Sequence, residues 1–314
     1  MRSNADQYPP TFTGTSYTYQ PYVDCKNWIA GRWVDAANGD TLVVDNPRHS
    51  APLGTVPCSG TQDVADAVKA ATAAFPGWRA TPLKERVQVL FRMKGLMEKH
   101  LEELTWLLSH ENGKTYAEAK ASVLKGIECL EMGISLPNMV AGGQLDVSRG
   151  VNCEITYEPL GVCAGIIPFN FPTMVPLWML PQALVAGNTF VLKPSEQVPY
   201  GSMKLAALFK EAGLPDGVFN VIHGDKVAVD RLLEHEDIAA VSFVGSTAIA
   251  KYVYEHGTKH GKRVQALGGA KNHMVIMPDA DMDMAANALM GAAYGSAGER
   301  CMAISVAVPV GEKT

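Results

Sequence analysis

The sequence is poor in charge, and neither sign dominates. Charged residues make up 19% of the 314 residues, and the formal net charge is −5. A basic surface that could neutralise a phosphate backbone is therefore not expected, which argues against nucleic acid as a partner. No apolar run reaches the roughly 18 residues that a membrane-spanning helix needs, so we expect no membrane association.

Targeting signals and paired cysteines are missing as well. Residues 1–26 are polar and contain proline, without the apolar stretch of a secretory signal or the arginine-rich character of a transit peptide, and we expect a poorly ordered arm. No two cysteines have C-x-x-C spacing, so we expect no metal site and predict reduced thiols in a cytoplasmic protein. The six cysteines are Cys25, Cys58, Cys129, Cys153, Cys163 and Cys301.

What is present is a chain long enough for two domains, with 47% apolar residues. Residues 27–47 alternate apolar and polar side chains between glycine and asparagine, which predicts short antiparallel strands. Residues 61–75, 83–113 and 117–133 have helical spacing. Residues 151–157 alternate again, and we predict a strand that either protrudes and pairs with another subunit or is capped by a loop of the same chain.

The middle third alternates strand and helix patterns through four full units. Its strands are short and apolar throughout, which is typical of parallel strands covered on both faces. We therefore predict an α/β fold with a doubly wound parallel sheet, whose ligands bind at the carboxyl ends of the strands. The predicted strands cover residues 161–167, 189–193, 218–222, 238–245 and 264–268, and the helices cover residues 173–186, 202–213, 227–236 and 247–257.

Three of these strand ends carry candidate ligand-binding residues. Asn170 follows the first strand, where its amide could stabilise an oxyanion or cap the next helix. Lys193 and Glu196 follow the second strand and either hold the hydroxyls of a ribose or form a solvated charge pair. Gly245 and Ser246 open a helix after the fourth strand, where a phosphate is favoured, although the G-x-G-x-x-G fingerprint is absent.

Cys301 is the candidate nucleophile. It follows a predicted helix over residues 282–294 and a turn of small residues, and its neighbour is Arg300. A nearby guanidinium and free backbone N–H groups would favour the thiolate. The alternative is a small buried apolar side chain, which is our interpretation of the other five cysteines.

Two further patterns are set aside. Residues 110–115 (HENGKT) end like a phosphate-binding loop, but Leu108 stands where that motif needs glycine, and the segment lies between predicted helices. His256 and His260 are four residues apart, but we expect Gly257 to break the helix between them, which argues against a metal site.

In order and spacing, five motifs resemble those of the aldehyde dehydrogenase superfamily, and the similarity runs from about Asn27 to the end of the chain. The resemblance implies that Cys301 attacks the aldehyde carbonyl, and that Asn170 and the Cys301 backbone N–H hold the oxyanion. It places NAD against Phe169, Lys193, Glu196, Gln197, Ser246 and Gly268. The motifs are PFNFP (168–172), NTFVLKPSE (188–196), AGLPDGVFNVIHG (212–224), VSFVGST (241–247) and GERC (298–301).

One departure indicates a subfamily. Hydrolytic members carry a glutamate in an ELGGK-like element, as the base that activates water. Here the element reads QALGGAKNH (265–273), with Ala266 or Leu267 in that place, and no glutamate lies between Glu255 and Glu299. The sequence resembles methylmalonate-semialdehyde dehydrogenases, which transfer the acyl group to coenzyme A and release CO2 with acetyl-CoA or propionyl-CoA.

The substrate carboxylate is expected to lie against Arg300 and Lys125. The second position is an arginine in that subfamily, and lysine cannot grip a carboxylate bidentately. Glu299 stands where the subfamily usually has glutamine, so other short semialdehydes remain open. The alternatives are a CoA-independent aldehyde dehydrogenase and a catalytically inert NAD-binding fragment.

The resemblance also implies a domain arrangement. Residues 27–141 and 159–267 form the NAD-binding domain, residues 142–158 form a protruding oligomerisation hairpin, and residues 268–314 begin a second α/β catalytic domain. The superfamily continues well past the cysteine, so this domain is incomplete and residues 305–314 form a strand without its partners. A homo-oligomer, dimer or tetramer, is expected for the full length.

Overall fold

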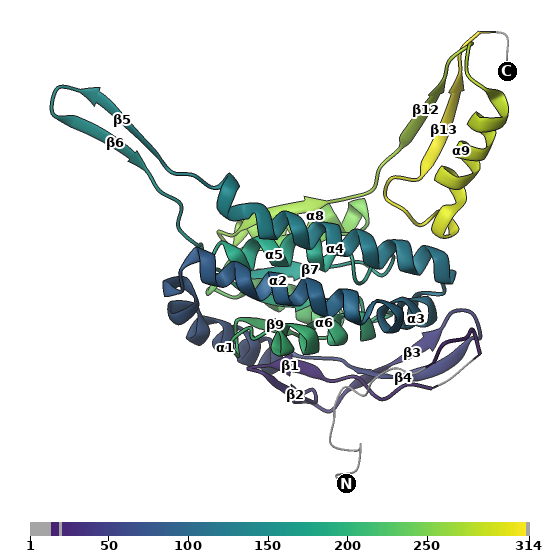
Figure 1. The fold of residues 1–314 in the computed structure, drawn as a ribbon. Coiled ribbons are helices and arrows are strands. Elements are labelled where there is room, and N and C mark those ends of the chain that lie inside the picture. The colour runs from purple at the N-terminus through teal and green to yellow at the C-terminus, as the bar shows by residue number, and fades with distance from the viewer. Residues whose placement is uncertain (1–13, 19–20, 312–314) are drawn as a thin grey trace.

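The computed structural model describes residues 14–18 and 21–311. Its centre is a seven-stranded sheet in the order β11-β10-β7-β8-β9-β1-β2 (Figure 1). The chain passes from β7 through β8 to β9 on one side, and then returns to β10 and β11 on the other side of β7. This reversal is the switch point of a doubly wound fold, so the predicted fold class is confirmed.

The five parallel strands fall where the sequence predicts them. Their alternate residues face opposite sides of the sheet, so Ala164 of β7 belongs to one apolar cluster and Cys163 to another. Both faces are therefore covered, as continuous apolar strands require. The parallel strands are β7 (Val162–Ile166), β8 (Thr189–Lys193), β9 (Phe219–Val221), β10 (Ile238–Val244) and β11 (Arg263–Leu267).

The helices divide between the two faces. α1, α7 and α8 share one apolar cluster with the sheet, and α2 to α6 share the other. The first group is α1 (Thr61–Ala80), α7 (Lys226–Glu234) and α8 (Thr247–Lys259). The second group is α2 (Leu83–Lys99), α3 (Leu101–Asn112), α4 (Tyr116–Met139), α5 (Pro176–Val185) and α6 (Tyr200–Glu211). No helix among the described residues is long and apolar enough to cross a membrane.

The predicted short antiparallel strands are also present. The strands β1 (Asn27–Ile29) and β2 (Arg32–Val34) extend the sheet, because Trp28 of β1 pairs with Val221 of β9. The strands β3 (Thr41–Asn46) and β4 (Ala51–Pro57) form a separate pair.

The expectation of a poorly ordered arm is wrong for its described part, while residues 1–13 and 19–20 lie outside the described residues. The backbone N–H groups of Tyr22 and Cys25 donate to Leu53 and Thr55 of β4, and Cys25 is buried. Ordering a polar segment costs conformational entropy. The backbone hydrogen bonds to β4 and the burial of Cys25 offset this cost.

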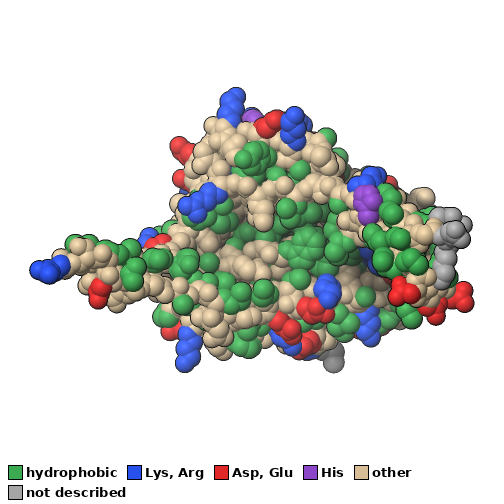
Figure 2. Space-filling model, turned by 90° about the horizontal axis from the view of Figure 1, so that it is seen from above, with side chains coloured by type: hydrophobic (Ala, Val, Ile, Leu, Met, Phe, Trp, Pro, Cys, Tyr) green, Lys and Arg blue, Asp and Glu red, His purple; other side chains and the backbone are tan. Residues whose placement is uncertain are grey.

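A long hairpin leaves the body beside α4 (Figure 1). It pairs β5 (Gly143–Ser148) with β6 (Val151–Ile155), and both strands are exposed along their whole length. The predicted strand over residues 151–157 thus finds its partner in its own chain. Seen from above, hydrophobic side chains gather over the middle of the molecule and the hairpin projects to one side (Figure 2).

The C-terminal unit projects from the body on the side away from the hairpin (Figure 1). It consists of β12 (Asn272–Ile276), α9 (Met282–Tyr294), the 3-10 turn η2 (Gly295–Gly298) and β13 (Ile304–Pro309). The prediction of the α9 bounds is confirmed. The prediction that the last strand has no partner is wrong, because β13 pairs in parallel with β12.

Candidate active site

A cavity of about 420 Å³ lies between the carboxyl ends of the parallel strands and the C-terminal unit. Residues after β7, β10 and β11 line it from the sheet, and the loop before β13 lines it from the other side. It brings together six of the residues predicted from the sequence: Phe169, Asn170, Ser246, Gly268, Arg300 and Cys301.

Asn170 and the Cys301 loop are joined directly. The side-chain amide of Asn170 donates to the backbone carbonyl of Glu299 at 2.5 Å. Asn170 is not the cap of the following helix, because α5 begins only at Pro176. The interpretation of Asn170 as a cap is therefore excluded, and the amide faces the loop that carries Cys301.

Cys301 is exposed, so the alternative of a buried apolar side chain does not apply to it. Its backbone carbonyl accepts a hydrogen bond of 2.9 Å from the Asn272 amide, which also donates to the Ala303 carbonyl at 3.0 Å. Of the other five cysteines, Cys25 and Cys163 are buried as expected, but this interpretation is wrong for Cys153, which lies on the exposed hairpin. Burial raises the pKa of the Cys163 thiol to about 11 and that of Cys25 well above its usual value. Cys301 is thus the accessible thiol of the cavity.

The turn before Cys301 has an unusual backbone. Ser296 and Ala297 have φ angles of 55° and 56°, a left-handed conformation that costs energy for residues with a side chain. The Ser296 N–H donates to Glu118 Oε1 of α4 at 2.6 Å. A Cβ atom on Gly295 would lie 2.8 Å from the Arg300 guanidinium, so this guanidinium lies directly across the turn.

The strand ends beside the cavity form a close-fitting cradle. The Gly245 N–H donates to the Leu267 carbonyl at 3.0 Å, and a Cβ atom there would lie 2.4 Å from the ring of buried Phe243. Ser246 is the N-cap residue of α8 and makes no side-chain capping bond. Free N–H groups, glycine surfaces and a positive helix end suit a pyrophosphate, so the residues present fit a dinucleotide.

Lys193 and Glu196 lie at the end of the neighbouring strand rather than in the cavity lining. Lys193 is buried at 5% exposure and forms an ion pair of 3.0 Å with Glu196, so this is not a solvated loop pair. Gln197 is exposed next to them. Because Lys193 pairs with Ile166 across the β7–β8 ladder, the pair lies at the same edge of the sheet as Phe169.

Sequence reasoning missed His223, which is fully buried near Lys193. Burial lowers the pKa of the His223 imidazole to about 3, and the positive charge of Lys193 acts in the same direction. The residue lies within a motif quoted above, but burial of an imidazole has no signal in a single sequence.

Lys125 is placed differently from Arg300. It is an exposed residue of α4, paired with Glu128 of the same helix, and it does not line the cavity. Of the two basic residues expected to hold the substrate carboxylate, Arg300 lines the cavity and Lys125 does not.

A second missed residue is Lys114, which lies behind Asn170. Its ammonium donates to the Asn170 carbonyl, and its charge lies 4.2 Å from the centre of the Phe171 ring. The segment of residues 110–115 was set aside as a phosphate loop, and no strand precedes it, since it joins α3 to α4. The sequence shows only a lysine in a turn. Its contact with Asn170 depends on tertiary structure and could not be inferred from that pattern.

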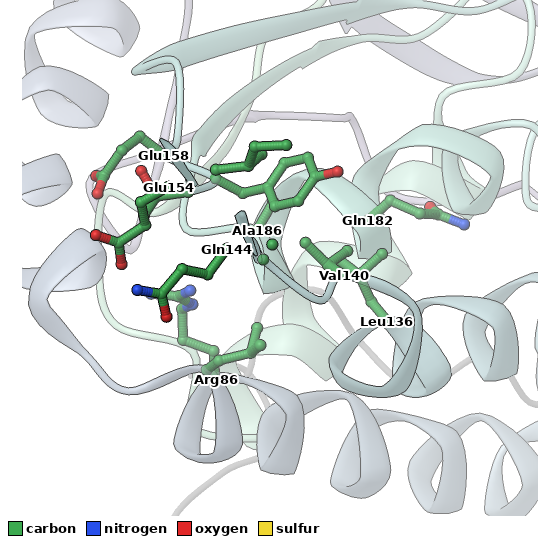
Figure 3. Close-up of a pocket in the computed structure, with 14 residues that line it drawn as sticks. Arg86, Leu136, Val140, Gln144, Glu154, Glu158, Gln182 and Ala186 are labelled. Atoms are coloured by element: carbon green, nitrogen blue, oxygen red, sulfur yellow. The ribbon is translucent and has the colours of Figure 1, made fainter. Parts of the chain in front are cut away.

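Another pocket, of about 840 Å³, lies away from Cys301 at the base of the hairpin (Figure 3). Arg86, Gln144, Glu154 and Gln182 line it with apolar neighbours. It contains none of the residues predicted for catalysis or cofactor binding, so the smaller cavity is the candidate active site despite its volume.

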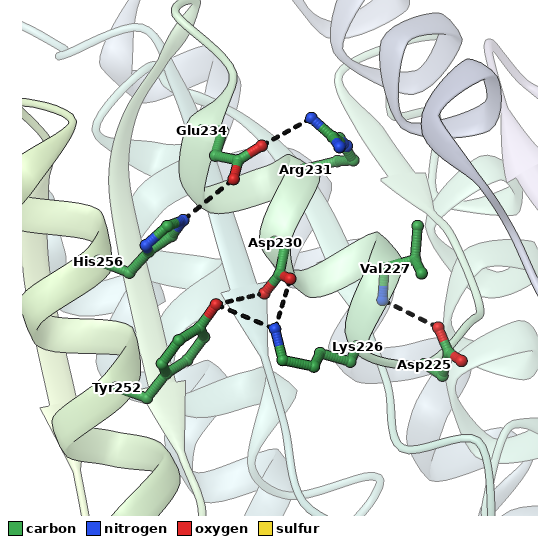
Figure 4. Close-up of polar contacts among 8 residues, drawn as sticks. All are labelled: Asp225, Lys226, Val227, Asp230, Arg231, Glu234, Tyr252 and His256. Carbon is green, nitrogen blue, oxygen red and sulfur yellow. Dashed lines mark hydrogen bonds and ion pairs between the residues drawn. The ribbon is translucent and has the colours of Figure 1, made fainter.

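The predicted helix break at Gly257 is wrong, because α8 continues to Lys259. A Cβ atom on Gly257 would lie 2.8 Å from Val264, so glycine here permits close packing of the helix on β11. His256 lies 3.1 Å from Glu234, beside a hydrogen-bonded group of Tyr252 and Asp230 (Figure 4). The described residues contain no cluster of three or more His, Cys, Asp or Glu side chains suited to a metal ion.

The cavity has no glutamate in the place used by hydrolytic enzymes. Ala266 packs with the core of the sheet, and Leu267 is 46% exposed. Among the described residues, Glu299 is the acidic residue that lines the cavity.

Comparison with known proteins decides the family, since the profile described as "Aldehyde dehydrogenase family" matches residues 33–310. The chain belongs to the aldehyde dehydrogenase family. A malonate-semialdehyde dehydrogenase of Geobacillus kaustophilus (strain HTA426) is 51% identical over 288 residues, covering 91% of this chain and 60% of that protein. One from Pseudomonas aeruginosa PAO1 is 54% identical over 282 residues, covering 88% of this chain and 56% of that protein.

Solved aldehyde dehydrogenases have the same fold. A methylmalonate-semialdehyde dehydrogenase from Oceanimonas doudoroffii aligns with a TM-score of 0.90 and 49% identity, covering 92% of this chain and 59% of that one. A protein from Sinorhizobium meliloti 1021, complexed with NAD, aligns with a TM-score of 0.91 and 48% identity, covering 94% and 60%. The chain spans about 60% of the length of the relatives it matches.

Proposed function

We propose that this chain carries the cofactor site and the nucleophile of an NAD-dependent, CoA-acylating dehydrogenase of malonate or methylmalonate semialdehyde. The observation that carries the proposal is the joining of Asn170 to the Cys301 loop in a cavity without the hydrolytic glutamate. The names of relatives about 50% identical support the substrate class.

The Cys301 thiolate adds to the aldehyde carbon, and the carbonyl oxygen takes up the negative charge. The Asn170 amide nitrogen has two hydrogens, of which one is used by the Glu299 carbonyl, so the second serves the oxyanion together with the Cys301 N–H. Collapse of this adduct expels a hydride and leaves a thioester on Cys301. NAD bound in this site would supply the hydride acceptor.

We assign NAD to the cradle of Gly245, Ser246 and Gly268, with Phe169 beside it. Lys193 and Glu196 would hold the hydroxyls of the adenosine ribose, with Gln197 next to them. The structural relative complexed with NAD supports NAD as the dinucleotide.

After hydride transfer, a β-carboxylate on the acyl group departs as CO2, and the proton that replaces it comes from solvent. The thiolate of coenzyme A then attacks the thioester carbon and releases Cys301. We propose that Arg300 orients the carboxylate, because it lines the cavity. Lys125 would assist only after leaving its pairing with Glu128.

A second candidate function has one observation in its favour. Glu299 supplies a carboxylate to the cavity lining, and a carboxylate can activate water for hydrolysis of the thioester. The enzyme would then release a free acid without coenzyme A. A Glu299→Gln variant separates the two, because it would abolish hydrolysis but leave CoA-dependent turnover intact.

The deciding experiment is NADH formation from NAD and malonate or methylmalonate semialdehyde, with and without coenzyme A. Sustained turnover only with coenzyme A supports acyl transfer to CoA, and undiminished turnover to free acid without it contradicts this. NAD binding without NADH formation supports the alternative of an inert NAD-binding fragment.

We further propose that the β5–β6 hairpin, over residues 142–158, joins copies of the protein into a dimer or tetramer in the cytoplasm. Its exposed apolar side chains would be costly if left in water. They are Leu145, Val147, Val151, Ile155 and Tyr157. Sedimentation of the intact protein and of a Val151→Lys, Ile155→Lys variant tests the contact, and an unchanged mass contradicts it.

A further inference from the structure

Residues 111–118, from the end of α3 to the first turn of α4, contact both loops of the cavity without lining it. Lys114 donates to the Asn170 carbonyl and to Asn112 Oδ1, the latter at 2.8 Å. The Asn112 amide in turn donates to the Phe169 carbonyl at 2.9 Å. Two consecutive carbonyls of the Asn170 loop are thus held by two neighbouring side chains.

The other end of this segment holds the loop of the nucleophile. Glu118 accepts the Ser296 N–H at 2.6 Å, and its Oε1 lies 4.0 Å from the Arg300 guanidinium. Burial opposes ionisation of Glu118, but hydrogen bonds from Ser296 and Thr115 outweigh it and hold the pKa of this carboxyl below its usual value. An ionised Glu118 therefore secures the left-handed turn before Cys301.

The segment is itself anchored in the core. Glu111, 2% exposed, accepts the backbone N–H groups of Tyr200 and Gly201 at 2.8 Å and 3.0 Å, where α6 begins. Ser109 Oγ donates to the Lys114 carbonyl at 2.6 Å. Lys114 thus extends from a fixed backbone, and its side chain is 5% exposed.

We propose that residues 111–118 set the distance between the oxyanion donor and the nucleophile, with Lys114 as the positioning residue for Asn170. This inference rests on the proposed catalytic roles of Asn170 and Cys301. The two loops belong to different units, one following β7 and the other in the C-terminal unit. A misplacement of about 1 Å between reacting groups costs on the order of a hundredfold in rate, so a common support has catalytic value.

The charge of Lys114 is balanced from several elements. Burial lowers the pKa of the Lys114 ammonium to about 8, while Glu299 and Glu118 oppose this, Arg300 adds to it, and Glu111 opposes it. Burial also raises the pKa of the Glu111 carboxyl to about 8, so both groups change charge in the same pH range.

Two reactions of Cys301 with small reagents distinguish a loss of Asn170 positioning from a general disruption of the cavity. 4-Nitrophenyl acetate acylates a thiolate through a tetrahedral oxyanion, whereas iodoacetamide alkylates it by displacement without an oxyanion. Neither reaction needs NAD, a semialdehyde or coenzyme A. The test therefore stands even if the proposed dehydrogenase activity fails, and the two failures are distinguishable.

For Lys114→Met we expect the acylation rate to fall about 10- to 100-fold while the alkylation rate changes less than about twofold. Lys120→Met is the matched control, because Lys120 lies on α4 and its charge faces the Tyr116 ring. Equal changes in both rates, or no change in either, overturn the proposal.

The route through Asn170 is tested by a double variant. Asn170→Ala alone lowers the acylation rate, and adding Lys114→Met lowers it little further if the lysine acts through the asparagine. Fully multiplicative effects overturn the proposal. Should Lys114→Met fail to fold, Asn112→Ala gives the second test, because it removes the bonds of this segment to the Phe169 carbonyl and to Lys114. Acylation should again slow more than alkylation, and equal changes in both rates overturn the proposal.

Discussion

The side-chain amide of Asn170 donates to the backbone carbonyl of Glu299, two residues before Cys301. This bond joins the end of a sheet strand to the loop of the nucleophile, across 129 positions of sequence. One amide hydrogen thus holds the loop, and in the proposed mechanism the other serves the oxyanion.

Replacement of Asn170 by alanine removes both functions. We expect kcat to fall about 10²- to 10³-fold, as for the loss of one donor to an oxyanion. NAD affinity should be unchanged, because the cradle at Gly245 is untouched. Steady-state NADH formation and NAD titration by calorimetry measure the two, and a loss confined to NAD binding would contradict the assignment.

Cys301→Ala is expected to abolish dehydrogenase turnover, with a loss of at least about a thousandfold. Its cause is removal of the attacking atom, so the melting temperature should stay close to that of the unmodified protein. Cys163→Ala is a useful comparison, since that buried thiol packs in the core and its loss should lower stability but leave the chemistry intact. Retained activity in Cys301→Ala rules out the nucleophile.

Arg300→Gln tests recognition of the substrate carboxylate. We expect KM for malonate semialdehyde to rise about 10- to 100-fold, in line with loss of a charge-assisted contact. For propanal, which has no carboxylate, KM should change little. Equal effects on both aldehydes would show that Arg300 supports the turn at Gly295 rather than the substrate.

Gly245→Ala should destabilise the fold by about 1–3 kcal/mol, because the added methyl group meets the buried Phe243 ring at 2.4 Å. Gly95→Ala on α2 is the matched control: nothing lies within 4 Å of its Cβ position, and alanine in a helix should stabilise by about 0.5–1 kcal/mol. Urea unfolding measures both. A neutral Gly245→Ala would show that the strand end can shift.

The pH dependence of stability should carry a contribution from His223. Its folded pKa of about 3 lies below the usual value of 6.5, so between these values the unfolded chain binds more protons. This contribution to stability is therefore present above pH 6.5 and is lost as the pH falls towards 3. Urea unfolding from pH 7 to pH 4 should show a flatter slope for His223→Gln, and parallel slopes would refute the burial effect.

Much of the fold follows from residue patterns. The bounds of β8 and α9 match their predictions because an apolar run and a helical repeat each end at turn residues. The hairpin that contains β5 followed only from the family resemblance and not from a residue pattern, since GQLDVS is exposed on both faces and has no core-facing alternation. Gly257 was misread because its small size serves packing against Val264 rather than helix termination.

The site was predictable where a residue follows a strand end, as Asn170 and Ser246 do. Lys114 could not be assigned, because a buried ammonium depends on carbonyls and rings supplied by distant segments. A motif match also could not predict that Lys125 pairs with Glu128, because this pairing depends on the rotamers of the two side chains on the helix surface.

β12, α9 and β13 follow one another directly in the chain, and β12 pairs with β13. Contacts between residues close in sequence form early in folding, because little loop entropy opposes them. The strand pair that flanks Cys301 can therefore form from its own neighbours. The turn at Ser296 and the setting of Asn170 need partners that lie more than 50 positions away in the chain. We therefore expect the β12–β13 pair to form before the Ser296 turn and the Asn170 loop are brought together.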